Sequence, residues 1–130
     1  MKTRLVTIHE WASVFEAASM MKKKDVGSLV VVNEAGKPFA LITAEDLVKK
    51  AIAGNKMVSK VGELASKPLI GIEPEKDLSD AAKLMGAKNI KRLMVFKQKE
   101  VVGIISSRDI IKISPSLYDL IAEKEHAENV

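Results

Sequence analysis

The chain has 130 residues, of which 47% are hydrophobic and 29% charged, and its net charge is +4. This composition is typical of a folded globular domain, and the lack of cysteine excludes a disulfide framework and thiolate chemistry. No stretch approaches the roughly 20 apolar residues that span a bilayer, and the N-terminus has no apolar run of signal-peptide type. We therefore expect a cytoplasmic protein.

The sequence contains an internal repeat. Glu16–Met21 matches Asp80–Met85, 64 positions later (80 − 16), and 25–32 matches 89–96 without a gap. Once one residue is dropped at Gly36, the match continues from 40–47 to 103–110. A repeat of roughly 60 residues buries only a marginal core alone. We therefore expect two similar units that pack face to face as one α+β globule.

The first repeat, residues 1–53, predicts the order β-α-β-β-α. Ser13 precedes Glu16 by three residues, which is the spacing of a capping box at a helix start. The nearly continuous apolar run 28–32 is typical of a buried strand, and Asn33–Gly36 predicts a hairpin turn. The expected elements are strands over 5–8, 28–32 and 39–42, and helices over 13–24 and 43–53, the last closed by Gly54-Asn55.

A linker over 54–67, with a short helix at Val61–Leu64, separates this repeat from the second, residues 68–113. The second repeat is expected to have strands over 69–72, 92–96 and 101–105, and helices over 77–88 and 106–113, with a turn at Gln98-Lys99.

The remaining residues, 114–130, depart from the repeat. Ser114-Pro115-Ser116 interrupts the chain, and Ser116 with Asp119 predicts the cap of a last short helix. Its apolar residues Leu117, Leu120 and Ile121 form one face, which covers the core or, alternatively, contacts a second copy. The charged end, 123–130, is expected to fray.

The motifs of common enzymes are missing. The sequence has no Gly-rich phosphate loop and no G-x-G-x-x-G, and its only histidines are His9 and His126. No Ser–His or Cys–His pair can be assembled from this set. We therefore expect a protein without catalytic activity and without a metal site.

A hydroxyl residue followed three positions later by Asp occurs once in each repeat, as Thr43-x-x-Asp46 and Ser106-x-x-Asp109. Structurally, the hydroxyl and the acid would cap the helix that follows. Functionally, a helix N-terminus favours phosphate, and an acid beside it can accept hydrogen bonds from ribose hydroxyls. Ile104, on the strand before, could then flank a base. The sequence leaves both interpretations open.

Arginines distinguish the two repeats. The second repeat has Lys91-Arg92 and Arg108 where the first has Gly27-Ser28 and Glu45. Guanidinium groups bind phosphate in a bidentate manner, so an anionic nucleotide is expected to favour the second repeat. The structural alternative is that Arg108 pairs with a neighbouring acid.

Together these segments resemble a tandem pair of CBS domains, named for cystathionine β-synthase, over residues 3–113. The segments that carry the resemblance are Val6-Thr7-Ile8, Glu16-Ala17 with Met20, 29–32, Gly36 and Thr43–Leu47, then Val61–Leu64, Asp80-Ala81-Ala82, 90–95 and Gly103–Ile110. The resemblance implies pseudo-two-fold symmetry with two clefts between the repeats. It also implies an adenosine ligand (AMP, ADP, ATP or S-adenosylmethionine), regulation of an effector protein and a disc-shaped homodimer.

The resemblance further implies which residues bind the ligand. In the second-repeat site, Asp109 would bind the ribose hydroxyls and Ser106 would bind phosphate or ribose. Arg92, with Lys91, would contact phosphate, and Ile72, Ile90 and Ile104 would line the base. Arg108, from its place in the motif, is a further candidate for the site. The matching set for a possible second site is Asp46, Thr43, Leu41, Val26 and Thr7. That set lacks the basic pair, and Ala40 replaces the glycine common before the last strand.

Two alternatives of other classes remain. A basic protein could bind nucleic acid, although its lysines and arginines are spread along the chain. A purely structural dimerisation module would keep both clefts empty.

Overall fold

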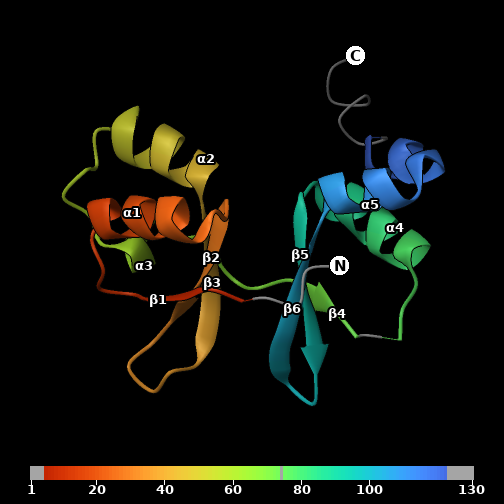
Figure 1. Ribbon diagram of the computed structural model, residues 1–130, viewed down its shortest axis with the longest axis horizontal. Coiled ribbons are helices and arrows are strands. Elements are labelled where there is room, and N and C mark those ends of the chain that lie inside the picture. Colours follow the sequence, from red (N-terminus) through yellow and green to blue (C-terminus); the bar gives the residue numbers. More distant parts are fainter. Residues whose placement is uncertain (1–4, 74, 123–130) are drawn as a thin grey trace. The chain divides into compact units, whose positions relative to one another are not determined.

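The computed structural model describes residues 5–73 and 75–122, and these form two compact units (Figure 1). The first unit is Leu5–Leu69, and the second begins at Ile70. Each unit contains one three-stranded sheet with helices packed on it, which confirms the predicted α+β class and the order β-α-β-β-α.

The first unit has the sheet order β1-β2-β3, in which β1 is parallel and β3 antiparallel to the central β2. Its elements are β1 (Thr7–His9), α1 (Val14–Lys24), β2 (Ser28–Val32), β3 (Pro38–Thr43), α2 (Ala44–Asp46), a π-helix (Leu47–Ile52) and α3 (Val61–Leu64). As predicted, the Ser13 side chain and Glu16 form a capping box at the start of α1.

The second unit repeats this topology with the order β4-β5-β6. Its elements are β4 (Gly71–Ile72), α4 (Leu78–Lys88), β5 (Arg92–Lys97), β6 (Glu100–Ser106), α5 (Ser107–Ile113) and a 3-10 turn (Pro115–Leu117). Asp77 caps α4 in a capping box with Asp80, as predicted. Gln98 and Lys99 both have positive φ, 51° and 69°, at the predicted turn between β5 and β6.

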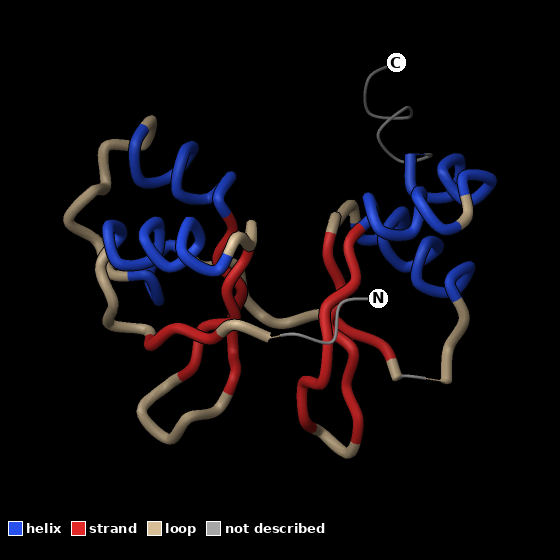
Figure 2. The backbone as a smooth tube through the Cα atoms, viewed as in Figure 1, coloured by secondary structure: helices blue, strands red, loops and turns tan. Residues whose placement is uncertain are grey.

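Each unit has its own hydrophobic core between its sheet and its helices. In the first unit, α1 presents Val14, Ala17 and Met21 at helical spacing to Leu29 and Ile42 of the sheet. In the second unit, α4 presents Ala81, Ala82 and Met85 to Leu93 and Ile105. The loops of the two strand hairpins lie at the ends of the sheets away from the helices (Figure 2).

Four predicted elements differ from the structure. The strand predicted over 5–8 is β1, Thr7–His9. The helix predicted over 43–53 is one α-helical turn followed by a π-helix, in which the Ala53 N–H donates to the Val48 carbonyl at 2.9 Å. Both helix types bring Leu47 and Ala51, four residues apart, to the core, so spacing alone could not distinguish them. The strand predicted over 69–72 is only β4, and Ser116 lies within the 3-10 turn and does not cap a helix start.

The segment predicted as a linker, 54–67, contributes to the first core. Val61, Leu64 and Ala65 are buried there, and Ser66 exchanges two backbone hydrogen bonds with Leu41 on β3, at 2.9 and 3.1 Å. The short helix predicted at Val61–Leu64 is confirmed as α3. This segment is therefore packed structure within the first unit.

The segment after α5 covers the second core, as the first interpretation of its apolar face predicted. Residues 118–122 are helical, and Leu117, Leu120 and Ile121 pack against the core cluster. A Cβ at Gly86 would lie 2.1 Å from the Leu120 carbonyl oxygen, so only glycine permits this approach. The predicted fraying of 123–130 lies outside the described residues. Within the described ranges, no helix has the length and apolar character needed to cross a membrane.

Candidate functional site

The second-repeat corner is the junction where β6 ends and α5 begins. The Asp109 N–H donates to Ser106 Oγ at 3.1 Å, and the Ser106 N–H donates to Asp109 Oδ2 at 3.2 Å. The Ser107 N–H donates to the Lys91 carbonyl at 2.8 Å, which ties this junction to the start of β5. Ser106 and Asp109 thus form a capping box, so the structural interpretation of this motif is confirmed.

The first-repeat corner has the same backbone geometry. Thr43 and Asp46 exchange two capping hydrogen bonds of 3.0 Å each, and the Ala44 N–H donates to the Gly27 carbonyl at 3.0 Å. The two corners therefore differ by at most 0.2 Å in these three hydrogen bonds. Any functional difference between them must come from the side chains around this shared frame.

Strand pairing brings the predicted arginine to the second-repeat corner. Arg92 is the cross-strand partner of Ser106, and Met94 is the partner of Ile104. Side chains of directly paired residues share a face, so Arg92, Ser106 and Ile104 lie on the same face of the sheet. Leu93 and Ile105, on the other face, belong to the core. Three of the predicted ligand residues are thus brought together by register alone.

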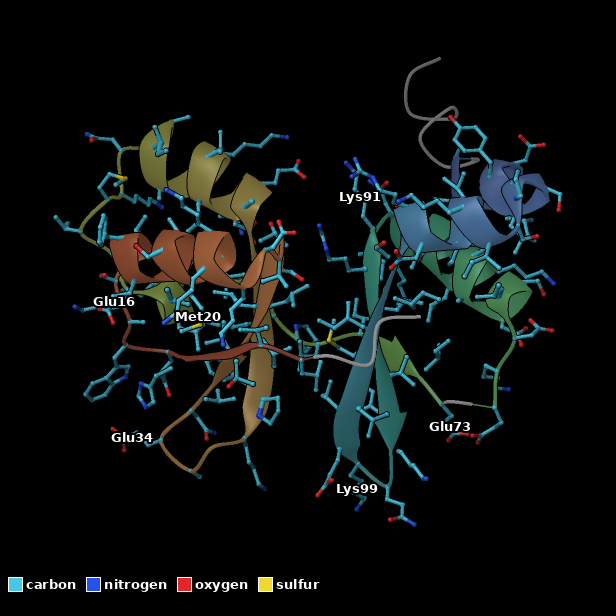
Figure 3. The ribbon with its side chains drawn as sticks, in the orientation of Figure 1. Glu16, Met20, Glu34, Glu73, Lys91 and Lys99 are labelled. Carbon is cyan, nitrogen blue, oxygen red and sulfur yellow. The ribbon has the colours of Figure 1, made fainter. Side chains whose placement is uncertain are left out.

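Lys91 and Arg108 flank this corner at the surface. Lys91 is exposed at the start of β5, at the opposite end of the β5–β6 hairpin from Lys99 (Figure 3). Arg108 is exposed in the first turn of α5, between Ser106 and Asp109 in sequence. Arg92 itself is half-buried. The corner therefore carries three cationic side chains, whereas Gly27, Ser28 and Glu45 stand at the matched positions of the first repeat.

Two of the predicted base-lining residues contact the second core. Ile72 and Ile90 pack against the core cluster on the helix side of the sheet, whereas Ile104 lies on the opposite face. By register, the residue of the second repeat that is equivalent to Thr7 is Gly71 and not Ile72. Thr7 pairs with Val30, and the residue that pairs with the equivalent Met94 is Gly71.

The sequence did not predict the close approach between Gly71 and Phe96. A Cβ at Gly71 would lie 2.3 Å from Phe96 Cε2 and 2.5 Å from the Met94 carbonyl oxygen. The aromatic ring thus takes the space that a side chain on β4 would need. Gly71 lies 64 residues after Thr7, so the repeat alignment itself indicates that the two positions are equivalent.

In the possible second site, Thr7 and Leu41 both pair with Val30 and so share one face of the first sheet with Thr43. Val26 lies apart from them, packed against the first core. The carboxylate of Asp46 has a further partner that the sequence did not predict. Lys50 Nζ lies 3.3 Å from Asp46 Oδ1 and donates to the Leu64 carbonyl at 3.0 Å.

An open depression of about 740 Å³ lies at the far end of β5 from the second-repeat corner, beside the β5–β6 turn. Its lining includes Glu73, Glu75, Lys97 and Lys99. A hydrogen bond with Glu75 raises the pKa of the exposed Glu73 carboxyl, and their mutual repulsion adds to this shift. Within the described residues, no group of three or more His, Asp or Glu side chains is placed to hold a metal ion.

The fold and the two corners define a paired β-α-β-β-α module, and comparison with known proteins gives its family. The model of the CBS domain matches twice, over residues 1–53 and 61–116. The chain therefore belongs to the CBS domain family, as the sequence resemblance predicted. A pair of these domains supports a regulatory role.

Two relatives illustrate the match. An uncharacterized protein of Methanopyrus kandleri is 34% identical over 112 residues, which cover 84% of this chain and 57% of that protein. A CBS domain-containing protein of Bacillus subtilis is 33% identical over 111 residues, which cover 85% of this chain and 79% of that one. The chain thus spans little more than half the length of the Methanopyrus relative.

Two solved structures have the same fold. One is a CBS domain pair in complex with 5′-methylthioadenosine and S-adenosyl-L-methionine, with 29% identity, a TM-score of 0.76, and coverage of 87% of this chain and 90% of that one. The other is a hexameric CBS-CP12 protein from bloom-forming cyanobacteria, with 32% identity, a TM-score of 0.77, and coverage of 85% and 66%.

Proposed function

We propose that this protein is a non-catalytic regulatory module that binds an adenine nucleotide (AMP, ADP or ATP) at the second-repeat corner. Asp109 accepts hydrogen bonds from the ribose hydroxyls, Ser106 donates its hydroxyl proton to ribose or phosphate, and Arg92 with Lys91 binds phosphate. Binding stabilises the module, and an effector protein responds to that change.

The observation that supports this proposal is the pairing of Arg92 with Ser106 across β5 and β6, since paired residues share a face of the sheet and Ser106 belongs to the capping box with Asp109. The Ser106 hydroxyl accepts a capping hydrogen bond and can still donate one to a ligand. The solved CBS pair with two adenosine-containing ligands supports an adenosine ligand as the class.

Charge favours a nucleotide over S-adenosylmethionine. The sulfonium of S-adenosylmethionine is cationic, and Arg92, Lys91 and Arg108 would repel it, whereas they attract phosphate. S-adenosylmethionine remains a ligand to test because a related CBS pair binds it. We expect the affinity order ATP or AMP, then adenosine, then S-adenosylmethionine.

A thermal-shift screen tests the proposal directly. At a ligand concentration 100 times Kd, binding stabilises the folded state by about 2.7 kcal/mol, which raises the melting temperature by on the order of 10 °C. We expect AMP or ATP to give such a shift. No shift with AMP, ADP, ATP, S-adenosylmethionine or NAD would contradict the proposal.

The variant Asp109→Ala should lose most of the ligand-induced shift, because it removes a charged acceptor from the ribose hydroxyls. Asp80→Ala is its matched control. Asp80 holds the same capping-box position at the start of α4, so both variants remove one capping acid. Both are expected to lower the ligand-free melting temperature similarly. If Asp80→Ala also abolished the ligand shift, the effect of Asp109→Ala would be structural.

We also propose that the module forms a homodimer through the first unit. Phe15 on α1 is 77% exposed and Ile52 on the π-helix 62% exposed, although both helices pack on the first core. The hexameric relative supports self-association within the family. Sedimentation should show a dimer that Phe15→Ser weakens and Val58→Ser, in a loop, does not. A monomer at all concentrations would refute this part.

A further inference from the structure

Lys50 forms an ion pair with Asp46, the acid of the first-repeat corner. Its Nζ lies 3.3 Å from Asp46 Oδ1, while Asp46 Oδ2 accepts a hydrogen bond from the Thr43 N–H at 3.0 Å. Both oxygens of the carboxylate therefore have partners within the chain. The Asp46 side chain is only 13% exposed, so water competes little for these contacts.

The same ammonium group also holds the segment that follows. Lys50 donates to the carbonyl of Leu64, the last residue of α3, at 3.0 Å. A cation at a helix C-terminus satisfies a carbonyl that has no partner within the helix. Lys50 therefore connects the corner acid to α3.

The second repeat has an apolar residue at the position that matches Lys50. Its matching position, 63 residues later (50 + 63) when Leu47 is aligned with Ile110, is Ile113. An isoleucine carries no charge and donates no hydrogen bond. Ile113 therefore cannot form with Asp109 the ion pair that Lys50 forms with Asp46.

We infer that Lys50 is the residue that closes the first-repeat corner to an adenosine ligand. Two ribose hydroxyls need acceptor positions on the carboxylate, and at Asp46 they compete with Lys50 for Oδ1, so that binding favours displacement of Lys50. This displacement also breaks the bond from Lys50 to Leu64. The inference rests on the proposed function, since it assumes that the Asp of a corner is the ribose acceptor.

The size of the effect follows from the two contacts. A partly exposed ion pair and one hydrogen bond to a carbonyl each contribute a small free energy. Their combined loss corresponds to an affinity change of about tenfold. Lys50→Met removes both contacts and keeps the aliphatic stem. Lys49→Met is the matched control. Lys49 pairs with Glu45 at 2.7 Å, so this substitution removes the same charge from the neighbouring position and leaves the contacts of Asp46 in place.

The first test is calorimetric titration of the full chain with adenosine in an Asp109→Ala background, which leaves the first-repeat corner as the ribose site. Lys50→Met should tighten adenosine binding about tenfold, whereas Lys49→Met and Lys50→Arg should not. An unchanged or weaker affinity in Lys50→Met would overturn the inference. Failure of the proposed function is a separate result, seen as absence of AMP binding by the unsubstituted chain.

The second test needs no ligand. The amides of Ala65 and Ser66 donate to Val61 and Leu41, both at 2.9 Å, directly after the carbonyl that Lys50 binds. Hydrogen exchange at these two amides should be faster in Lys50→Met than in the unsubstituted chain or in Lys49→Met. Equal exchange rates in all three proteins would show that Lys50 does not hold α3, and would overturn the inference.

Discussion

The two repeats share a backbone and differ in the charges placed on it. Both corners have the same capping box and the same bond from the next amide to the opposite strand. In the second repeat, Lys91 and Arg92 stand where the first repeat has Gly27 and Ser28. In the first, Lys50 brings a cation to the acid itself. The two copies thus share their local hydrogen bonds and differ in the charged side chains around them.

The repeats also differ in what covers their first helix. In the second, the segment after α5 packs on α4 at Gly86. In the first, the matching position is Lys22, in the exposed basic last turn of α1. One copy is covered by its own chain, and the other leaves apolar side chains such as Phe15 exposed.

The largest expected effect comes from Gly86→Ala. Alanine usually stabilises a helix relative to glycine by up to about 1 kcal/mol, but here its methyl group would meet the Leu120 carbonyl oxygen. We expect a loss of about 1–3 kcal/mol, as for overpacking. Lys22→Ala should stay within about 0.5 kcal/mol. Urea unfolding measures both, and stabilisation by Gly86→Ala would show that the covering segment does not pack closely on α4.

Exchanging a corner residue between the repeats should have the next largest effect. Arg92→Ser introduces the residue that the first repeat has at Ser28. We expect AMP affinity to fall about tenfold or more, since a charge-assisted contact to phosphate is lost, and adenosine affinity to change little. Calorimetric titration with both ligands separates these outcomes. Equal losses for AMP and adenosine would mean that Arg92 does not act through phosphate.

Removing the capping hydroxyl should cost the two repeats the same stability. Thr43→Ala and Ser106→Ala each delete one cap acceptor, so each should lower the free energy of unfolding by about 1 kcal/mol. Only Ser106→Ala should also weaken AMP binding. Parallel thermal and binding measurements test this separation. Loss of AMP binding in Thr43→Ala alone would assign the nucleotide to the first-repeat corner.

The smallest expected effect is the pH dependence that the Asp77 cap of α4 adds to the stability of the protein. The backbone N–H of Asp80 and the Ser79 hydroxyl both donate to Asp77, and these bonds lower the pKa of its carboxyl. A lowered pKa adds stability above the ordinary Asp range, and this contribution is lost as the pH falls through the folded-state pKa. The cap of α1, Ser13, does not titrate.

The corresponding measurement compares the unsubstituted chain with Asp77→Ser, which keeps a cap acceptor and removes the titration. Between pH 6 and pH 3, the melting temperature of the unsubstituted chain should fall more than that of the variant. The difference should be slight, because Asp77 is exposed. Parallel curves for the two proteins would show that the Asp77 cap does not contribute charge-dependent stability.

Much of the fold could be predicted because it depends on short-range interactions. The caps of Ser13, Asp77, Thr43 and Ser106 each join residues three apart, so the spacing of residue types was sufficient. The repeat itself predicted the same order of elements, β-α-β-β-α, along both units, since one topology had to serve both copies. The difference in basic residues between the corners was also visible in the sequence.

The assignment of side chains to the faces of a sheet depends on register, which the sequence indicates poorly for a short strand. Ile72 was placed in the ligand face, but pairing puts Gly71 opposite Met94 and leaves Ile72 on the core side. A shift of one residue along a strand moves a side chain to the other face, and a short strand such as β4 carries too little pattern to prevent that error.

The sequence by itself determined the duplication, the order of elements, the helix caps and the unequal distribution of arginines, because each is a property of neighbouring residues or of the repeat. Only the tertiary structure decided that Lys50 reaches both Asp46 and Leu64, that α3 belongs to the first core, and that Gly86 accommodates Leu120. These contacts join residues brought together by chain folding, and no local spacing encodes them. The physical reason is that a long side chain or a close backbone approach depends on the final positions of both partners.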